Sequence, residues 1–92
     1  MVYWNEEKNL ELQRKRGISF EEIADIIIRG DYIEILENPS RPDQMIFVIS
    51  FNEYTWVVPF VVQDDETIFL KTAFPSRQFH KKYGDEYGKE ET

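Results

Sequence analysis

The sequence predicts an α+β fold, because apolar residues recur at helical spacing before Gly30 and form strand-like runs after it. A short basic segment that begins with a helix-capping serine follows the last run. We therefore expect two N-terminal helices, a four-stranded, mainly antiparallel sheet and a short C-terminal helix. The 92 residues suit one small domain, residues 1–92, in which the charged residues 84–92 are expected to form a flexible tail.

Both expected helices carry end signals. The first is predicted from about Asn5 to Arg16, since its first residue is a good N-cap and Gly17 supplies the left-handed residue that ends a helix. The second begins with a capping box of Ser19 and Glu22 and ends at Gly30. Its apolar residues fall at i, i+3, i+4, i+7 and i+8, namely Phe20, Ile23, Ala24, Ile27 and Ile28. We expect this face to pack on the sheet.

The strands are predicted from alternation and from β-rich runs. Residues 32–37 alternate, and a loop from Asn38 to Asp43 follows. Three β-rich runs come next, at Met45 to Phe51, Tyr54 to Val62 and Thr67 to Phe74. Turns at Asn52-Glu53 and near Asp64-Asp65 would join them as an antiparallel meander. Pro59 has no N–H for the ladder, so it predicts a bulge or an edge in the second run.

Composition excludes several classes of protein. The chain has no cysteine, so disulfides and thiolate metal sites are excluded. The N-terminus lacks a signal-peptide pattern and no apolar run reaches membrane-spanning length, so we expect a cytoplasmic protein without membrane contact. The three acids Asp64, Asp65 and Glu66 are adjacent at a turn and would not converge on one ion. We therefore expect no metal and no cofactor.

The most unusual segment runs from Lys71 to Tyr83, with four basic residues, the only histidine and no acid, in a chain of net charge −7. It is expected to form a local anion-attracting patch. At helical spacing, Arg77, His80 and Lys81 share one face, and the aromatic pair Phe79 and Tyr83 faces the core. In the strand before them, alternation places Leu70, Thr72 and Phe74 on one face and Phe69, Lys71 and Ala73 on the other.

Several stretches resemble the BrnT-type toxins of bacterial toxin–antitoxin pairs. These are Trp4-Asn5 before a helix, Lys8, the block from Gly17 to Glu22, and antiparallel strands that lead into a basic segment with Ser76-Arg77. The resemblance covers nearly the whole chain, and the Gly-Ile-Ser-Phe-Glu-Glu block is its most specific part. It implies a small α+β ribonuclease related in fold to the RelE-type toxins. Arg16 stands where that family commonly has a histidine.

The resemblance implies a toxin that cleaves RNA without a metal and is neutralised by a cognate antitoxin. That antitoxin is expected to be basic and often to carry a ribbon-helix-helix DNA-binding domain. RNA cleavage at a 2′-hydroxyl needs a base, an acid and positive charge on the phosphorane. Our candidates are Lys71, Arg77 and His80 as catalytic residues, with Lys81, Arg14 and Arg16 as RNA-binding residues.

Each candidate also has an ordinary structural explanation. Lys81 and the cluster from Arg14 to Arg16 suit the negative ends of their helices, and a lone exposed histidine usually has no function. A non-catalytic interaction module with a degenerate toxin fold therefore stays open as the alternative. The net charge of −7, without a basic recognition helix, favours a basic protein partner over direct binding of duplex DNA by the chain alone.

Overall fold

The structure is a computed structural model that describes residues 1–64 and 66–84. Its elements are β1 (Val2–Tyr3), α1 (Glu6–Arg16), α2 (Phe20–Ile28), β2 (Glu34–Glu37), β3 (Met45–Phe51), β4 (Tyr54–Val62), β5 (Ile68–Leu70), β6 (Phe74–Pro75), α3 (Arg77–Phe79) and a π-helical turn η1 (His80–Gly84). The α+β class is as predicted. The layout differs, because the sheet has six strands rather than four.

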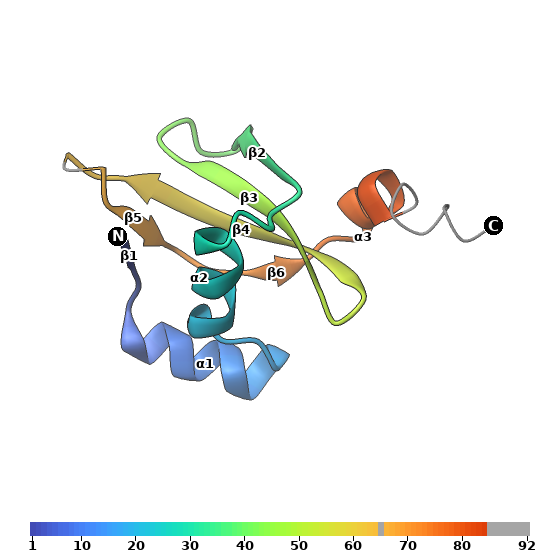
Figure 1. The fold of residues 1–92 in the computed structure, drawn as a ribbon, viewed down its shortest axis with the longest axis horizontal. Coiled ribbons are helices and arrows are strands. Elements are labelled where there is room, and N and C mark those ends of the chain that lie inside the picture. Colours follow the sequence, from blue (N-terminus) through green and yellow to red (C-terminus); the bar gives the residue numbers. More distant parts are fainter. Residues whose placement is uncertain (65, 85–92) are drawn as a thin grey trace.

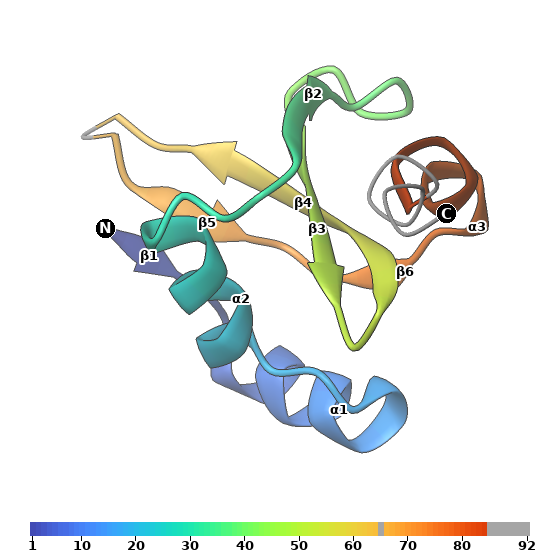
Figure 2. The same cartoon turned by 45° about the vertical axis from the view of Figure 1, so that its right-hand side comes forward.

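The sheet has the strand order β1-β5-β4-β3-β2, and β6 pairs with β4 beyond the end of β5. All pairings are antiparallel except that of β1 with β5, which makes the sheet mixed. The sequence analysis missed β1 because two residues are too few to show alternation. Figures 1 and 2 show α2 between α1 and the strands, with α3 near the end of the sheet where the β3–β4 hairpin turns.

Both N-terminal helices begin and end as predicted. The Asn5 side chain accepts a hydrogen bond from the backbone N–H of Lys8 (3.0 Å), and Gly17 ends α1 with a φ of 70°. Ser19 and Glu22 form both bonds of the capping box. Gly30 follows α2 with a φ of 76°, a conformation that glycine adopts without strain.

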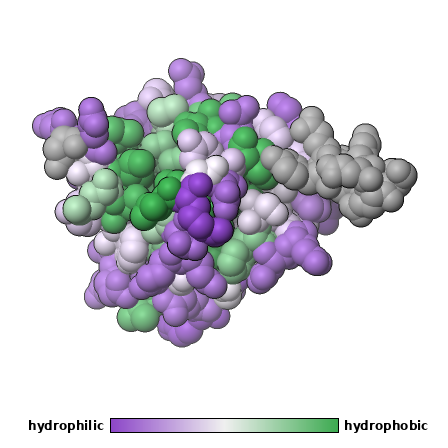
Figure 3. Space-filling view, in the orientation of Figure 1, coloured by the Kyte–Doolittle hydropathy of each residue, from purple (hydrophilic) through white to green (hydrophobic). Residues whose placement is uncertain are grey.

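Helix α2 supplies most of the helical part of the core. Phe20, Ile23, Ala24 and Ile27 are buried, as predicted. Ile28 is not, since 74% of its surface is exposed at the last residue of the helix, and Ile26 is buried instead. Helix α1 is mostly polar, and Figure 3 shows a largely hydrophilic surface in the lower part of the molecule, where α1 lies.

Asn9, which the sequence analysis did not single out, joins the two helices. It is fully buried in α1, and its Oδ1 accepts a hydrogen bond from the backbone N–H of Phe20 (2.7 Å). Its Nδ2 donates to Glu21 (2.8 Å) and to Glu6 (3.3 Å). The bond with Asn9 is the main reason that the pKa of Glu21 lies below its ordinary value. One amide thus fixes the start of α2 against α1.

The β3–β4 hairpin forms at the predicted turn. Asn52 and Glu53 have positive φ values of 53° and 63°, as a two-residue type I′ turn requires. Phe51 pairs with Tyr54, and the register continues to Met45 opposite Phe60. The second expected turn contains residue 65, and the expected tail contains residues 85–92, so these parts lie outside the described residues.

The third β-rich run is not one strand but two, because of Pro59. The carbonyl of Pro59 accepts a hydrogen bond from the backbone N–H of Lys71 (2.9 Å), so its nitrogen, which has no hydrogen, faces the same neighbour. Phe60 and Val57 are three positions apart in β4. The residues that pair with them, Leu70 and Phe74, are four positions apart. One extra residue is therefore accommodated opposite Pro59. The prediction was a bulge or an edge in the second run, whereas the bulge lies in the third run, on the strand that faces Pro59.

This bulge overturns the predicted face assignment of the run. Ala73 lies in the core with Leu70, whereas Phe74 is 37% exposed, the reverse of what regular alternation gives. The side chain of Arg16 stabilises this arrangement, since its Nη1 donates to the carbonyl oxygen of Ala73 (2.6 Å). The C-terminal end of α1 is thus tied to the bulge.

Candidate functional site

The C-terminal segment places His80 differently from the prediction. Helix α3 has three residues and continues as a π-helical turn, in which each residue turns through a smaller angle than in an α-helix. The His80 ring stacks on Tyr54, with 4.2 Å between the ring centroids. Its Nδ1 lies 3.0 Å from Oγ1 of the buried Thr55. The prediction that His80 faces outward with Arg77 and Lys81 is therefore wrong.

Gly84 closes over the same histidine. A Cβ atom added at Gly84 would lie 2.6 Å from Nδ1 of His80, so a larger residue would push the ring off Thr55. The aromatic pair follows the prediction, because Tyr83 is buried and stacks with the half-buried Phe79 at 5.9 Å. His80 thus fastens the last helical turn to β4, which is a structural role.

The remaining basic candidates are dispersed. Arg77 and Lys81 are exposed on the last helical segment and form no ion pair with any described residue. Arg14 is exposed on α1 beside Leu10, which is itself 55% exposed. The side chain of Arg16 donates a hydrogen bond to the carbonyl oxygen of Ala73. The structure therefore does not gather these side chains around His80.

Lys71 lies in a different place, on one wall of a hollow of about 370 Å³. The opposite wall is the loop between β2 and β3, and Pro59 of β4 lies between the two walls. The full lining is Asn38, Ser40, Arg41, Gln44, Pro59, Lys71, Thr72 and Phe74. We call it the cationic hollow, because its charged residues are one arginine and one lysine.

The charges of the cationic hollow are uncompensated. Its lining contains no carboxylate. Neither Arg41 nor Lys71 forms an ion pair with a residue in the described ranges 1–64 and 66–84. The ammonium of Lys71 lies 5.4 Å from the centre of the Phe69 ring, a cation–π contact that leaves its hydrogen-bond donors available. Amides, hydroxyls and an exposed Phe74 complete a surface suited to an oxyanion.

Arg41 was missed in the sequence because it stands alone in a turn-rich loop, between Pro39 and Pro42. Nothing in the local pattern connects it with Lys71, which is 30 positions further along the chain. The connection depends on the pairing of β3 with β4 and on the bulge opposite Pro59. The one signal in the sequence that could have identified Arg41 was its position between two prolines, and this stretch was interpreted only as a loop.

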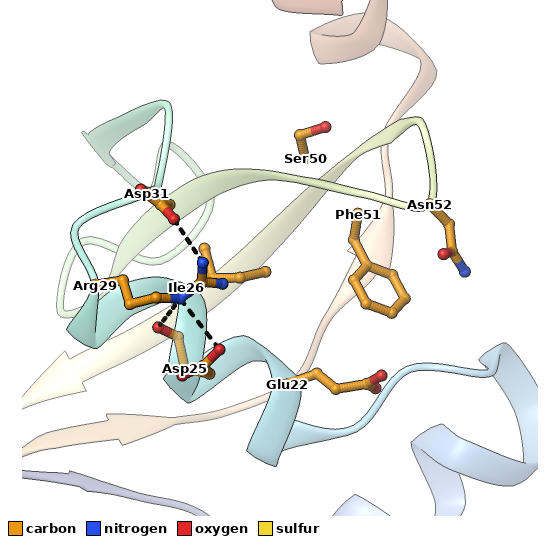
Figure 4. Close-up of a pocket in the computed structure, with 8 residues that line it drawn as sticks. All are labelled: Glu22, Asp25, Ile26, Arg29, Asp31, Ser50, Phe51 and Asn52. Carbon is orange, nitrogen blue, oxygen red and sulfur yellow. Dashed lines mark hydrogen bonds and ion pairs between the residues drawn. The ribbon is translucent and has the colours of Figure 1, made fainter.

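A second hollow, of about 400 Å³, lies between α2 and the β3–β4 hairpin and has the opposite charge. Figure 4 shows Arg29 between Asp25 and Asp31, with Glu22 nearby and Ser50, Phe51 and Asn52 on the hairpin side. We call it the acidic hollow. Arg29 contacts Asp25 at 3.1 Å and Asp31 at 2.9 Å, so its cation is neutralised within the protein.

Searches for similar proteins give no further constraint: no protein-family model, no curated protein and no solved structure matches this chain. Among the described residues, no cluster of three or more histidine, cysteine or acidic side chains is placed to hold a metal ion. None of the helices within residues 1–64 and 66–84 is long and apolar enough to cross a bilayer.

Proposed function

We propose that this protein is the toxin component of a type II toxin–antitoxin pair, which binds RNA at the cationic hollow and cleaves it without a metal. The BrnT-like residues and the α+β fold support this assignment. The observation that carries it is the pair of unneutralised cations, Arg41 and Lys71, in a hollow without carboxylates on a protein of net charge −7. Two unpaired cations in one hollow attract an anion more strongly than either does alone.

The proposed reaction is attack by the 2′-hydroxyl oxygen of a ribose on the adjacent phosphorus. A new P–O bond forms, the bond to the 5′-oxygen breaks, and the products are a 2′,3′-cyclic phosphate and a 5′-hydroxyl. Arg41 and Lys71 stabilise the negative charge of the phosphorane, and the Lys71 ammonium donates a proton to the leaving oxygen. The 2′-hydroxyl proton passes to solvent water. His80 has no part in the reaction, since it packs on Tyr54.

The experiment is controlled expression of the protein, scored by growth and by RNA integrity, with and without a neighbouring gene for a small basic protein. We expect growth arrest and RNA cleavage that the neighbour relieves. Lys71→Ala should abolish both effects, whereas Lys82→Ala, the same change at an exposed lysine outside the hollow, should not. Folded Lys71→Ala protein that remains as toxic as the parent would contradict the proposal.

A second function has one observation in its favour. His80, the only histidine of the chain, is not among the residues that line the hollow. This favours a non-catalytic module that binds phosphate groups. Purified protein that binds RNA through Lys71 but leaves it intact over long incubation would select this alternative.

We also propose a basic polypeptide as the neutralising partner, attracted by the acidic surface outside the cationic hollow. The support is the net charge of −7 and the three carboxylates around the acidic hollow, Glu22, Asp25 and Asp31. The protein alone should not bind duplex DNA tightly at physiological salt. A complex that binds DNA would do so through the partner's own domain.

A further inference from the structure

We infer that Arg41 is the second ligand of a phosphate oxyanion in the cationic hollow, and that the loop from Asn38 to Gln44 is built to hold Arg41 opposite Lys71. The inference deepens the proposed function by naming a further binding residue. It rests on that function only for the source of the phosphate, which is the RNA backbone. Binding of the phosphate group itself stands on the geometry of the hollow.

The loop fixes the backbone on both sides of Arg41. Its N–H donates to the carbonyl of Asn38 (3.3 Å), and its own carbonyl accepts from the N–H of Gln44 (2.9 Å). The Asn38 side chain accepts from the N–H of Ser40 (3.0 Å) and donates to the Gln44 side chain (3.4 Å). Pro39 and Pro42 restrict φ on either side. The loop is thus ordered by its own bonds.

The guanidinium of Arg41 takes no part in this bonding. The loop's bonds use its backbone, and its side chain has no ion pair or hydrogen bond with a described residue. Because the loop backbone is already ordered, binding of a ligand costs only the conformational entropy of the side chain, and the guanidinium donors are available to it. An arginine fork also matches two oxygens of one phosphate.

The opposite wall is prepared in the same way. The Lys71 backbone is bonded to Pro59, while its ammonium lies over the Phe69 ring and forms no ion pair with a residue that the structure describes. Two cations that line one hollow repel each other, and a doubly or singly charged oxyanion between them removes that repulsion. The planar guanidinium of Arg41 on one wall and the compact ammonium of Lys71 on the other bind one phosphate in complementary ways.

The test is a titration of ¹⁵N-labelled protein, followed by amide chemical shifts at constant ionic strength. Inorganic phosphate is the first probe, and a short single-stranded RNA is the second. We expect saturable shifts concentrated in residues 38–44 and 71–74. Arg41→Gln should weaken phosphate binding by about tenfold or more, because a charge-assisted contact is lost. Arg41→Lys should recover only part of the affinity, since the fork is lost.

Lys82→Gln is the matched control, because it removes one positive charge from an exposed side chain outside the hollow. Equal weakening by Lys82→Gln and Arg41→Gln would overturn the inference in favour of general electrostatics. Phosphate shifts centred on residues 76–82 would overturn it as well. If Arg41→Gln loses phosphate binding but still arrests growth, the inference is supported and the proposed function is contradicted. The experiment therefore distinguishes failure of the inference from failure of the proposed function.

Discussion

The acidic and the cationic hollow have similar volumes, about 400 and 370 Å³, yet their charges are satisfied in opposite ways. In the acidic hollow, Arg29 is paired with Asp25 and Asp31, so the single cation of that hollow is neutralised within the protein. In the cationic hollow, Arg41 and Lys71 have no such partner among the described residues. The comparison teaches that a charged hollow points to a ligand when its charges are left unpaired, rather than when they are merely numerous.

The largest expected effect comes from giving the cationic hollow a carboxylate of its own. Ser40→Asp touches neither cation but places a negative charge among them, so phosphate affinity should fall by about tenfold or more. Ser50→Asp, an exposed serine of the acidic hollow, changes the net charge equally and should have little effect. Calorimetric titration of both variants measures the difference, and equal losses would remove the distinction between the hollows.

Glu21, at the α1–α2 junction, should make the stability of the fold depend on pH. Glu21 has a folded pKa below its ordinary value of 4.5, chiefly through its bond with Asn9. A lowered folded pKa stabilises the protein above that ordinary value, and this stabilisation is lost as the pH falls through the folded pKa. Asn9→Ala should lower the free energy of unfolding by about 1–3 kcal/mol, because it removes buried hydrogen bonds.

Denaturant unfolding at neutral and acidic pH measures this effect. Glu21→Gln is the control, since it keeps an acceptor for Asn9 but does not titrate. It should lose much less stability at neutral pH and should flatten the decrease at low pH. An unchanged acid profile in Glu21→Gln would place the pH dependence elsewhere, for example at Glu11, whose pKa is lowered mainly by its hydrogen bond with Lys15.

The smallest expected effect is on the stability of the acidic hollow. Asp25→Asn and Asp31→Asn each remove an exposed ion pair with Arg29, and such pairs contribute about 0–1 kcal/mol. The double variant should stay folded and leave Arg29 unpaired. We then expect weak phosphate-induced shifts at the end of α2, seen in the same titration. A double variant with no response there would show that an unpaired cation alone does not make an anion site.

Much of the fold could be predicted because its signals are local. The caps at Asn5 and Ser19, the positive-φ turn at Asn52-Glu53 and the bounds of β3 and β4 all follow from neighbouring residues. The division of the third run into β5 and β6 could not, because it results from Pro59 on a different strand. The π-helical turn that carries His80 inward likewise depends on its contacts with β4.

Of the residues that line the cationic hollow, the sequence analysis named one as a candidate. Lys71 was named as a catalytic candidate in the basic segment, and it lines the cationic hollow. Arg77, His80, Lys81, Arg14 and Arg16 are not among the lining residues. Arg16 was assigned to RNA from its charge, yet it is bonded to Ala73. Charge can be counted along a chain, whereas the pairing of charges requires tertiary neighbours.

The bulge opposite Pro59 has a consequence for local motion. Because β5 and β6 are paired with β4 on either side of it, the stretch from Lys71 to Ala73 is held at both ends but lies outside the regular ladder. Its opening would break the bond from Lys71 to Pro59 and the bond from Arg16 to the carbonyl of Ala73, and would leave both flanking strands paired. Amide hydrogens there should exchange by local opening, at a lower free energy than the global unfolding that exposes the centre of β4. The lysine of the cationic hollow can therefore adjust to a ligand without loosening the sheet.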